Sequence, residues 1–263
     1  MLQIKDLTIS YKRSDISALS NISLQIDTNS LVVIAGASGS GKSSIAKAIM
    51  NLLPRGTNKS GTIALDNNDI STIKRDIFFK SIGFLPQFPM DYILNLLVYD
   101  EIAFPLENIG HSKEEIDKKV TEILDLLHIS HLKNKIVTEL SSGELQKVSL
   151  ATALISKPSL LILDEPFARM DPNSELNLVE LLQELKVVTT IIILEHHLDY
   201  ILELADQLVI LEQGKIIAKG NPKSIIQYLK ENRPEITKIK IPNQTDIYIS
   251  YNKILTEILD YLN

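Results

Sequence analysis

A glycine-rich segment with one lysine, GASGSGKS at residues 36–43, directly follows the aliphatic run LVVIA at residues 31–35. Glycines at this spacing let successive backbone N–H groups turn inward onto phosphate oxygens, and a helix that begins at the lysine adds its positive dipole end. The lysine then reaches the β and γ phosphates, and the serine after it ligates Mg²⁺. A glycine-rich turn formed by accident is the alternative, and the preceding strand disfavours it. The pattern predicts a nucleoside triphosphate site built from Gly36, Ser38, Gly39, Ser40, Gly41, Lys42, Ser43 and Ser44.

Two adjacent carboxylates follow a second aliphatic run, LLIL at residues 160–163. At the tip of this strand Asp164 can hold Mg²⁺, directly or through a water, opposite the Ser43 hydroxyl. Hydrolysis of a phosphoanhydride needs a base that orients and deprotonates a water, and Glu165 is the candidate. The simpler alternative for Glu165 is a solvent-exposed carboxylate at a strand end.

The composition narrows the class of protein. The chain has 263 residues, 44% of them hydrophobic and 23% charged, which is enough to bury a large core. Its net charge of −6 offers no basic field for nucleic acid, and the absence of cysteine excludes disulfides and thiolate chemistry. Residues 1–6 lack the basic start of a signal peptide, and the longest apolar runs are far below the roughly 20 residues of a membrane span. We expect an intracellular chain that reaches a membrane only through a partner.

The pattern of apolar residues predicts an α/β fold. Alternation over residues 2–9, 22–26 and 61–65 indicates half-buried strands, and residues 1–86 otherwise read as strands and turns apart from the helix at Lys42. Continuous aliphatic runs at 31–35, 160–163 and 191–194 indicate central parallel strands. Residues 90–157 have helical spacing, with a capping box at 112–115, and Gly214 marks a tight turn. We expect one unit over residues 1–231 and an appended segment over 232–263, which contains two prolines and then an apolar pattern. That pattern could form a helix that pairs two subunits, or a helix that packs on its own core.

The segment LSSGE at residues 140–144 precedes the run that ends in Asp164 and Glu165 by twenty residues. In this order and at these distances, the three motifs resemble those of the ATP-binding cassette (ABC) family, which carries an L-S-G-G-Q signature. The resemblance covers about residues 1–230. It implies a P-loop NTPase (RecA-like) core, an antiparallel β subdomain, and an inserted α-helical subdomain at about residues 90–157 that carries the signature. The implied cofactors are ATP and Mg²⁺.

The same resemblance assigns roles to single residues. Gln87 matches the Q-loop, where an amide hydrogen-bonds the Mg²⁺ shell or the attacking water. His196 matches the position that contacts the γ-phosphate, and its spacing to Asp199 favours it over His197. Tyr11 lies where the family places an aromatic residue that stacks on adenine, although packing on the first sheet is the alternative.

Part of the implied site would act on a second subunit. In the family each bound ATP is closed by the other subunit's signature, so Ser141 and Gly143 would grip the partner's γ-phosphate, and Asp171 falls in the D-loop between the two sites. Three residues of the surface that would contact the other subunit's ATP depart from the family pattern: Ser142, Arg169 and Met170. A homodimer would inherit these changes in both sites. We therefore expect a heterodimer with a different ABC ATPase subunit, with a homodimer as the alternative.

The strings VYDEIAFPLENIG at 98–110 and EHHLD at 195–199 look similar to the ATPases of energy-coupling factor and cobalt/nickel importers. Such ATPases work at the cytoplasmic face of the membrane, as peripheral subunits, with a transmembrane coupling protein and a substrate-binding membrane protein. The apolar residues Ile93, Leu94, Leu96 and Leu97 could receive a coupling helix, or simply pack in the helical subdomain. The alternatives are an ATPase of another importer or an exporter, and a soluble cassette protein without transport; a simple kinase would lack the LSSGE segment. The transported molecule cannot be named, because these subunits do not touch it.

Overall fold

The computed structural model describes residues 1–12, 16–196, 198 and 201–232 of the chain. His197, Asp199 and nearly all of the predicted appended segment lie outside the described residues. Among the described residues, no helix has the length and apolar character that crossing a membrane requires.

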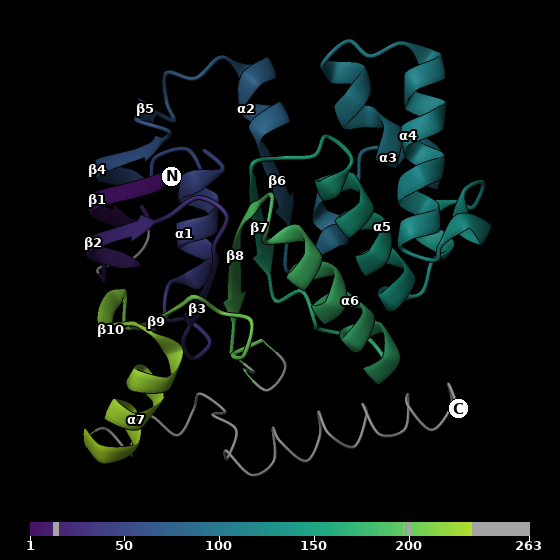
Figure 1. Ribbon diagram of the computed structural model, residues 1–263. Coiled ribbons are helices and arrows are strands. Elements are labelled where there is room, and N and C mark those ends of the chain that lie inside the picture. The colour runs from purple at the N-terminus through teal and green to yellow at the C-terminus, as the bar shows by residue number, and fades with distance from the viewer. Residues whose placement is uncertain (13–15, 197, 199–200, 233–263) are drawn as a thin grey trace, which may run out of the picture.

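A six-stranded sheet forms the centre of the molecule, in the order β10-β9-β3-β8-β7-β6 (Figure 1). Strand β3 lies parallel to both β8 and β9, and β7 lies parallel to both β8 and β6. The three aliphatic runs predicted as central strands are β3, β7 and β8, so that prediction is confirmed. The strands of this sheet are β3 (Leu31–Ala35), β6 (Ile82–Leu85), β7 (Leu160–Asp164), β8 (Thr190–Glu195), β9 (Gln207–Glu212) and β10 (Lys215–Gly220).

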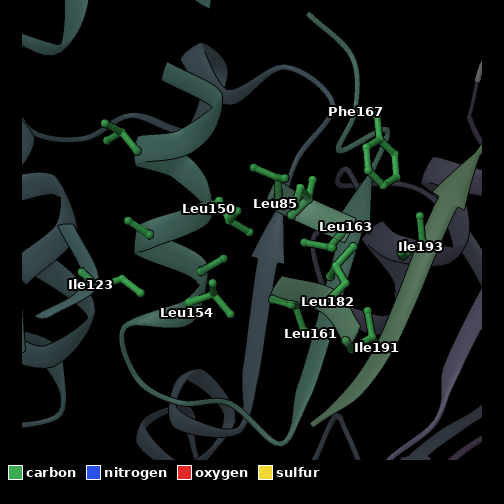
Figure 2. Packing of buried hydrophobic residues seen from close by; sticks show 14 of the residues in the cluster. Leu85, Ile123, Leu150, Leu154, Leu161, Leu163, Phe167, Leu182, Ile191 and Ile193 are labelled. Carbon is green, nitrogen blue, oxygen red and sulfur yellow. The ribbon is translucent and has the colours of Figure 1, made fainter. Parts of the chain in front are cut away.

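Each central strand divides its side chains between two hydrophobic clusters, because successive residues of a strand point to opposite faces. Leu31 and Val33 join the cluster that includes helical residues between positions 98 and 182. Val32 and Ile34 join the cluster on the opposite face, which includes the helix at 42–49 and the antiparallel strands. Figure 2 shows the first cluster, in which side chains of β7 and β8 face leucines of two flanking helices. Burial on both faces explains why these strands are continuously aliphatic.

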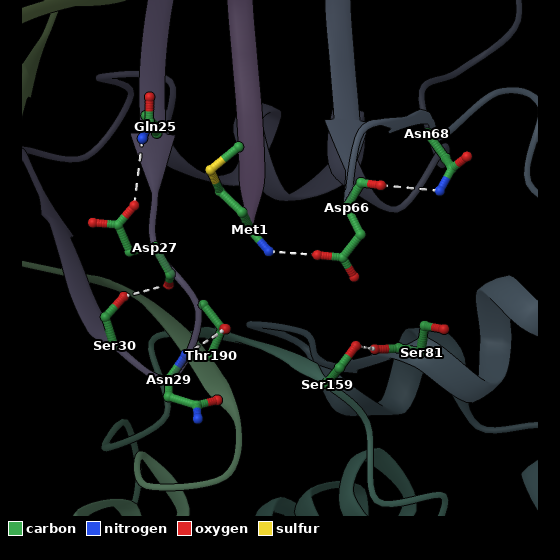
Figure 3. Close-up of polar contacts among 10 residues, drawn as sticks. All are labelled: Met1, Gln25, Asp27, Asn29, Ser30, Asp66, Asn68, Ser81, Ser159 and Thr190. Carbon is green, nitrogen blue, oxygen red and sulfur yellow. Dashed lines mark hydrogen bonds and ion pairs between the residues drawn. The ribbon is translucent and has the colours of Figure 1, made fainter.

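A second, antiparallel sheet packs against the first helix, in the order β2-β1-β4-β5 (Figure 1). Its strands are β1 (Leu2–Ser10), β2 (Leu19–Ile26), β4 (Asn58–Leu65) and β5 (Asn68–Asp69), so the alternating segments are strands as predicted. The backbone N–H of Asn29, which lies between β2 and β3, donates to the Thr190 hydroxyl at the start of β8, at 3.1 Å (Figure 3). This bond ties the connection from the second sheet to the central one.

The helices surround the central sheet, and α3, α4 and α5 pack together at one end of the molecule (Figure 1). The predicted capping box opens α4, where Ser112 and Glu115 exchange both bonds. Helix α2 was not predicted, since its N-cap residue makes no side-chain bond and Phe78 is its one buried residue. The helices are α1 (Lys42–Ile49), α2 (Arg75–Ser81), α3 (Val98–Asn108), α4 (Lys113–Leu126), α5 (Ser142–Leu154), α6 (Pro172–Leu185) and α7 (Pro222–Asn232), with 3-10 turns at Pro89–Tyr92, Ser130–Leu132 and Val137–Glu139.

The predicted tight turn at Gly214 joins β9 to β10 and also supports the glycine-rich loop. Gln213 and Gly214 both have positive φ, 47° and 74°, as a two-residue hairpin turn requires. The Gly214 N–H donates to the carbonyl of Ser40 at 2.9 Å. The hairpin therefore holds the middle of the loop that follows β3.

Candidate nucleotide-binding site

The predicted site residues of the core lie at one edge of the central sheet. Parallel strands end at the same edge, and β3, β6, β7 and β8 are followed there by polar loops. These loops carry the glycine-rich segment, Gln87, the pair Asp164 and Glu165, and His196. The topology thus gathers residues that are up to 160 positions apart in the sequence.

The glycine-rich loop has the close backbone approaches that its composition predicts. A Cβ at Gly36 would lie 2.4 Å from the carbonyl oxygen of Leu211. Gly41 has a φ of 109°, and a Cβ there would lie 2.6 Å from the carbonyl oxygen of Ala18. Helix α1 begins at Lys42, as predicted, so its free N–H groups face the loop. Side chains at Gly36 or Gly41 would break this cradle.

Lys42 is buried at the centre of the loop, with 5% of its surface exposed. Its ammonium donates to the carbonyls of Gly36 at 2.7 Å and Ala37 at 3.2 Å. Burial lowers the pKa of Lys42, and the negative charges of Glu165, Asp164 and Glu195 oppose that shift. A cation surrounded by carboxylates and loop carbonyls is positioned to exchange these partners for phosphate oxygens.

Asp164, at the end of β7, is 3% exposed. Burial raises its pKa, whereas a hydrogen bond from the Ser43 hydroxyl lowers it. Its Oδ1 has no hydrogen-bond partner among the described residues. A buried carboxylate oxygen without a partner, next to a serine hydroxyl, fits Mg²⁺, which prefers one or two protein oxygens together with phosphate and water. The described part of the chain has no cluster of three His, Cys, Asp or Glu side chains that could hold a metal.

Glu165 is the point at which three predicted residues meet. Its Oε2 accepts a hydrogen bond from Gln87 Nε2 at 2.8 Å, and its Oε1 lies 3.3 Å from His196 Nδ1. Its backbone has a φ of 52°, in the left-handed region, and its N–H donates to the carbonyl of Leu194 at 2.9 Å. Gln87 therefore donates to one carboxylate oxygen, and the His196 ring lies at ion-pair distance from the other.

Glu195 enters the sequence analysis only as the first residue of the EHHLD string, without a role in the site, and the structure places it in this cluster. Glu195 ends β8 and is 2% exposed. Its Oε1 accepts the backbone N–H of His196 at 2.7 Å and lies 3.1 Å from His196 Nδ1. A charged residue at the end of an aliphatic strand, directly before a candidate histidine, is the sequence signal that could have identified it.

Tyr11 lies beside the start of α1. Its hydroxyl is 3.0 Å from the Ser44 Oγ, so the structure brings these two predicted residues together. Tyr11 also packs in part against the cluster beneath the antiparallel sheet. Its stacking on adenine stays a prediction.

The signature residues lie on the helical side and bond to their own neighbours. Ser141 is the N-cap of α5, where its hydroxyl donates to Glu144 Oε2 at 2.8 Å and accepts from the Glu144 N–H at 3.3 Å. The backbone N–H of Ser141 also donates to this carboxylate, and it is the main cause that lowers the pKa of Glu144 to about 2. Asp171 is likewise the N-cap of α6. The structure does not test the action of Ser141, Gly143 and Asp171 on a partner's nucleotide.

The structure shows two contacts that the sequence does not reveal. One joins the loop after β6 to the loop after β7, and the other joins the loop after β7 to α5. The guanidinium of Arg169 lies 5.3 Å from the ring centroid of Phe88, the residue after Gln87. Arg169 therefore directs its charge onto a ring of its own chain. The buried Gln146 of α5 donates to the carbonyl of Pro166 at 3.2 Å. A Cβ at Gly143 would lie 3.3 Å from the carbonyl oxygen of Arg169, so the signature and this loop are also in close contact.

Comparison with known proteins decides the family. The ABC transporter family model matches residues 19–168, which is more than half of the chain. The chain belongs to the ABC transporter family. An ABC transporter ATP-binding protein of Clostridium tetani is 32% identical over 240 residues, covering 91% of the cassette and 53% of that relative. The cassette spans about half or less of the length of the first few curated relatives it matches, whereas one from Pyrococcus abyssi, 29% identical, is matched over 99% of its length.

Solved structures agree with this assignment. The cbiO1 protein of Clostridium perfringens, described as part of the ABC transporter complex cbiONQ, is 31% identical with a TM-score of 0.70, covering 89% of the cassette and 96% of that chain. A dimeric bacterial ABC transporter cassette is 26% identical with a TM-score of 0.76, covering 84% and 99%. The predicted α/β fold with a P-loop NTPase core is confirmed, and so is the resemblance to the ABC family.

Proposed function

We propose that this ABC cassette binds and hydrolyses MgATP to power a membrane importer of the energy-coupling factor type, for a vitamin or a transition metal ion. The observation that carries the proposal is the meeting of Lys42, Asp164, Glu165, Gln87 and His196 at the edge of the sheet where the glycine-rich loop opens. No single contact decides the reaction. Together these groups supply a phosphate cradle, a metal ligand, a base and a group for the γ-phosphate.

Each group has a distinct part in hydrolysis. Lys42 and the N–H groups of the loop bind the triphosphate, because they offer charge and donors in a dry site. Ser43 and Asp164, with Gln87 beside them, would hold Mg²⁺, which neutralises phosphate charge when bound. Glu165 orients the water and takes its proton, and its contacts with Gln87 and His196 are the ones that must loosen for water to reach it.

The proposal includes a second cassette subunit. A structural relative is a dimeric cassette, and the same cassette was also solved in a post-hydrolysis state bound to ADP and phosphate. Ser142, Arg169 and Met170 depart from the family pattern, and in a family dimer these positions would belong to the surface that completes the other subunit's site. We infer a heterodimer, in which these changes affect one of the two sites.

We infer that a membrane coupling protein docks on this cassette. A cavity of about 720 Å³ opens between the central sheet and the helical region, with an apolar lining and a charged pair, Arg75 and Asp76, on its wall. Leu94 and Leu96, two of the four apolar residues noted in the sequence, are 70% and 66% exposed. The similarity to cbiO1, whose complex contains further proteins, supports such a partner and the cytoplasmic face of the membrane as the location. The apolar lining of the cavity is formed by Met50, Phe79, Ile82, Phe84, Phe104, Pro105, Ile109 and Ala153.

To test the proposal, the cassette is purified alone and, in a second preparation, from membranes after co-expression with the proteins encoded by neighbouring genes. The mass of each assembly and its rate of phosphate release are then measured. We expect a complex with one different cassette subunit and at least one multi-span membrane protein, and ATPase activity that rises on assembly. A self-associated chain with full activity and no second cassette in its membrane complex would refute the heterodimer. Absence of MgATP hydrolysis in every assembly would refute the function.

A further inference from the structure

We propose that Arg169 and Phe88 form a brace between the two loops that carry Gln87 and Glu165, and that this brace keeps Gln87 beside the reacting water. Both are positioning residues, because they act through Gln87. The inference rests on the proposed function for the identity of the reaction. Its geometric basis is the distance of 5.3 Å between the guanidinium carbon of Arg169 and the centroid of the Phe88 ring.

Two contacts join these loops, and they differ in chemistry. The first is the hydrogen bond from Gln87 Nε2 to Glu165 Oε2 at 2.8 Å, which uses the proposed base itself. The second joins the residue after Gln87 to Arg169, and it uses no group that the reaction needs. A cation within about 6 Å of a ring centroid is attracted by the negative face of the ring. The second contact can therefore persist when the first one opens.

Opening of the first contact is part of the proposed reaction. Water has to reach Glu165, and the Gln87 amide then gives up its place on that carboxylate. Held by this bond alone, Gln87 would be free to move away when its amide is needed to orient the water. The brace limits this movement, because it acts on the adjacent residue. Pro86 and Pro89 are buried on either side of the pair, and their fixed φ makes Gln87 and Phe88 move together.

The backbone of Arg169 is held in a conformation that a side chain rarely adopts. Its φ is 68°, in the left-handed region, which costs free energy for any residue with a Cβ. A turn hydrogen bond from the Met170 N–H to the carbonyl of Phe167, at 3.3 Å, spans this residue, and Met170 packs in part against the main hydrophobic cluster. The loop backbone is thus fixed by its own contacts, and the Arg169 side chain lies over the Phe88 ring.

The size of the effect follows from the exposure of the brace. Phe88 is 49% exposed and Arg169 is exposed as well, and cation–π contacts at such sites are at the weak end of their range. That strength corresponds to a factor of about two to five in a rate or an equilibrium constant. The coupling between two substitutions is therefore the informative quantity.

The first test is a double-mutant cycle in the assembly that hydrolyses ATP. Arg169→Met keeps most of the stem and loses the charge, and Phe88→Leu stays apolar and loses the ring. We expect each variant to lower kcat by about two- to fivefold with KM for MgATP within about twofold, and the double variant to be no slower than the slower single one. Arg169→Lys, which keeps a cation, should retain most of the wild-type kcat.

The matched control for these rates is Arg55→Met, which removes an exposed arginine elsewhere and should leave kcat unchanged. An unchanged kcat in Arg169→Met or Phe88→Leu overturns the proposal. Effects that multiply in the double variant, or an equal fall in Arg55→Met, also overturn it.

The second test needs no hydrolysis and uses the full chain without nucleotide, with ¹⁵N-labelled glutamine. The side-chain amide signal that disappears in Gln87→Met identifies Gln87. We expect its hydrogen exchange to be about two- to fivefold faster in Arg169→Met and Phe88→Leu than in the wild type and Arg55→Met, because the bond to Glu165 opens more often without the brace. Equal exchange in all four proteins overturns the proposal. If the wild type neither binds nor hydrolyses MgATP, the proposed function fails, and the exchange rates still decide whether the brace holds Gln87.

Discussion

Replacing Glu165 by glutamine is the most direct test of the site. The variant keeps the size of the side chain but removes the group that accepts the water proton, which costs a rate factor of about 10²–10⁴, or about 2.7–5.4 kcal/mol of barrier. The structure adds a second effect. Gln87 Nε2 donates to Oε2 of Glu165, and an amide that placed its nitrogen at that position would face this donor with another donor, whereas the orientation that keeps the bond turns its nitrogen toward His196 Nδ1. We expect the loss of rate to lie within that range.

Nucleotide binding should respond differently. The negative charge of Glu165 is one cause of the raised pKa of Asp164, so its removal lets that pKa fall and keeps the metal ligand ionised. We expect MgATP affinity to be unchanged or tighter, and ATP-bound dimers to accumulate with the partner. Phosphate release and binding of a fluorescent ATP analogue measure the two effects, with the exposed Glu203→Gln as the matched control. Turnover near that of the wild type would remove Glu165 as the base, and loss of binding would contradict the separation of roles.

Three further predictions concern single side chains. Lys42→Met nearly keeps the length of the side chain but loses its charge and its hydrogen bonds to the loop. We therefore expect MgATP affinity to fall by about a hundredfold or more while the circular dichroism spectrum stays unchanged. Calorimetric MgATP binding at wild-type affinity would refute the assignment of Lys42 to the phosphate cradle. Asp171→Ala removes the N-cap bonds of α6 and should lower the free energy of unfolding in urea by about 1 kcal/mol, whereas Asp171→Ser should restore most of it. The pKa of Glu144 is lowered to about 2, so its stabilising effect is complete above the ordinary glutamate pKa of about 4.3 and is lost as pH falls toward 2. Glu144→Gln should therefore be less stable than the wild type at neutral pH, and the difference should shrink in acid; a constant difference would show that the charge is irrelevant.

The parts of the fold that sequence predicts are those set by local constraints. Residues 31–35 and 160–163 are recognisable because these parts of strands buried on both faces have no polar positions. The cradle is recognisable because Gly36 and Gly41 stand where a Cβ would collide with backbone. Asp164 and Glu165 are recognisable because they directly follow such a strand, and parallel strands bring their ends together.

The remaining features depend on contacts that sequence does not contain. Phe88 and Arg169 are 81 positions apart, and nothing in either segment predicts that ring and guanidinium meet. Helix α2 lacks a capping signal and has little buried surface, so its existence depends on the core beneath it. By contrast, Ser141 and Glu144 have the spacing of a capping box, a signal that is overlooked when the segment is compared only with a phosphate-binding motif.

The left-handed backbone of Glu165 has a consequence for the evolution and engineering of this protein. A residue with a Cβ costs about 1–2 kcal/mol in that conformation, and glycine would occupy it without this cost. The strand end thus stores conformational energy at a position where the chain also places a carboxylate next to Asp164. In directed evolution for thermal stability alone, we expect substitutions of Glu165 to be selected in the first rounds. Variants of this cassette selected for stability should therefore be assayed for ATP turnover after each round of selection.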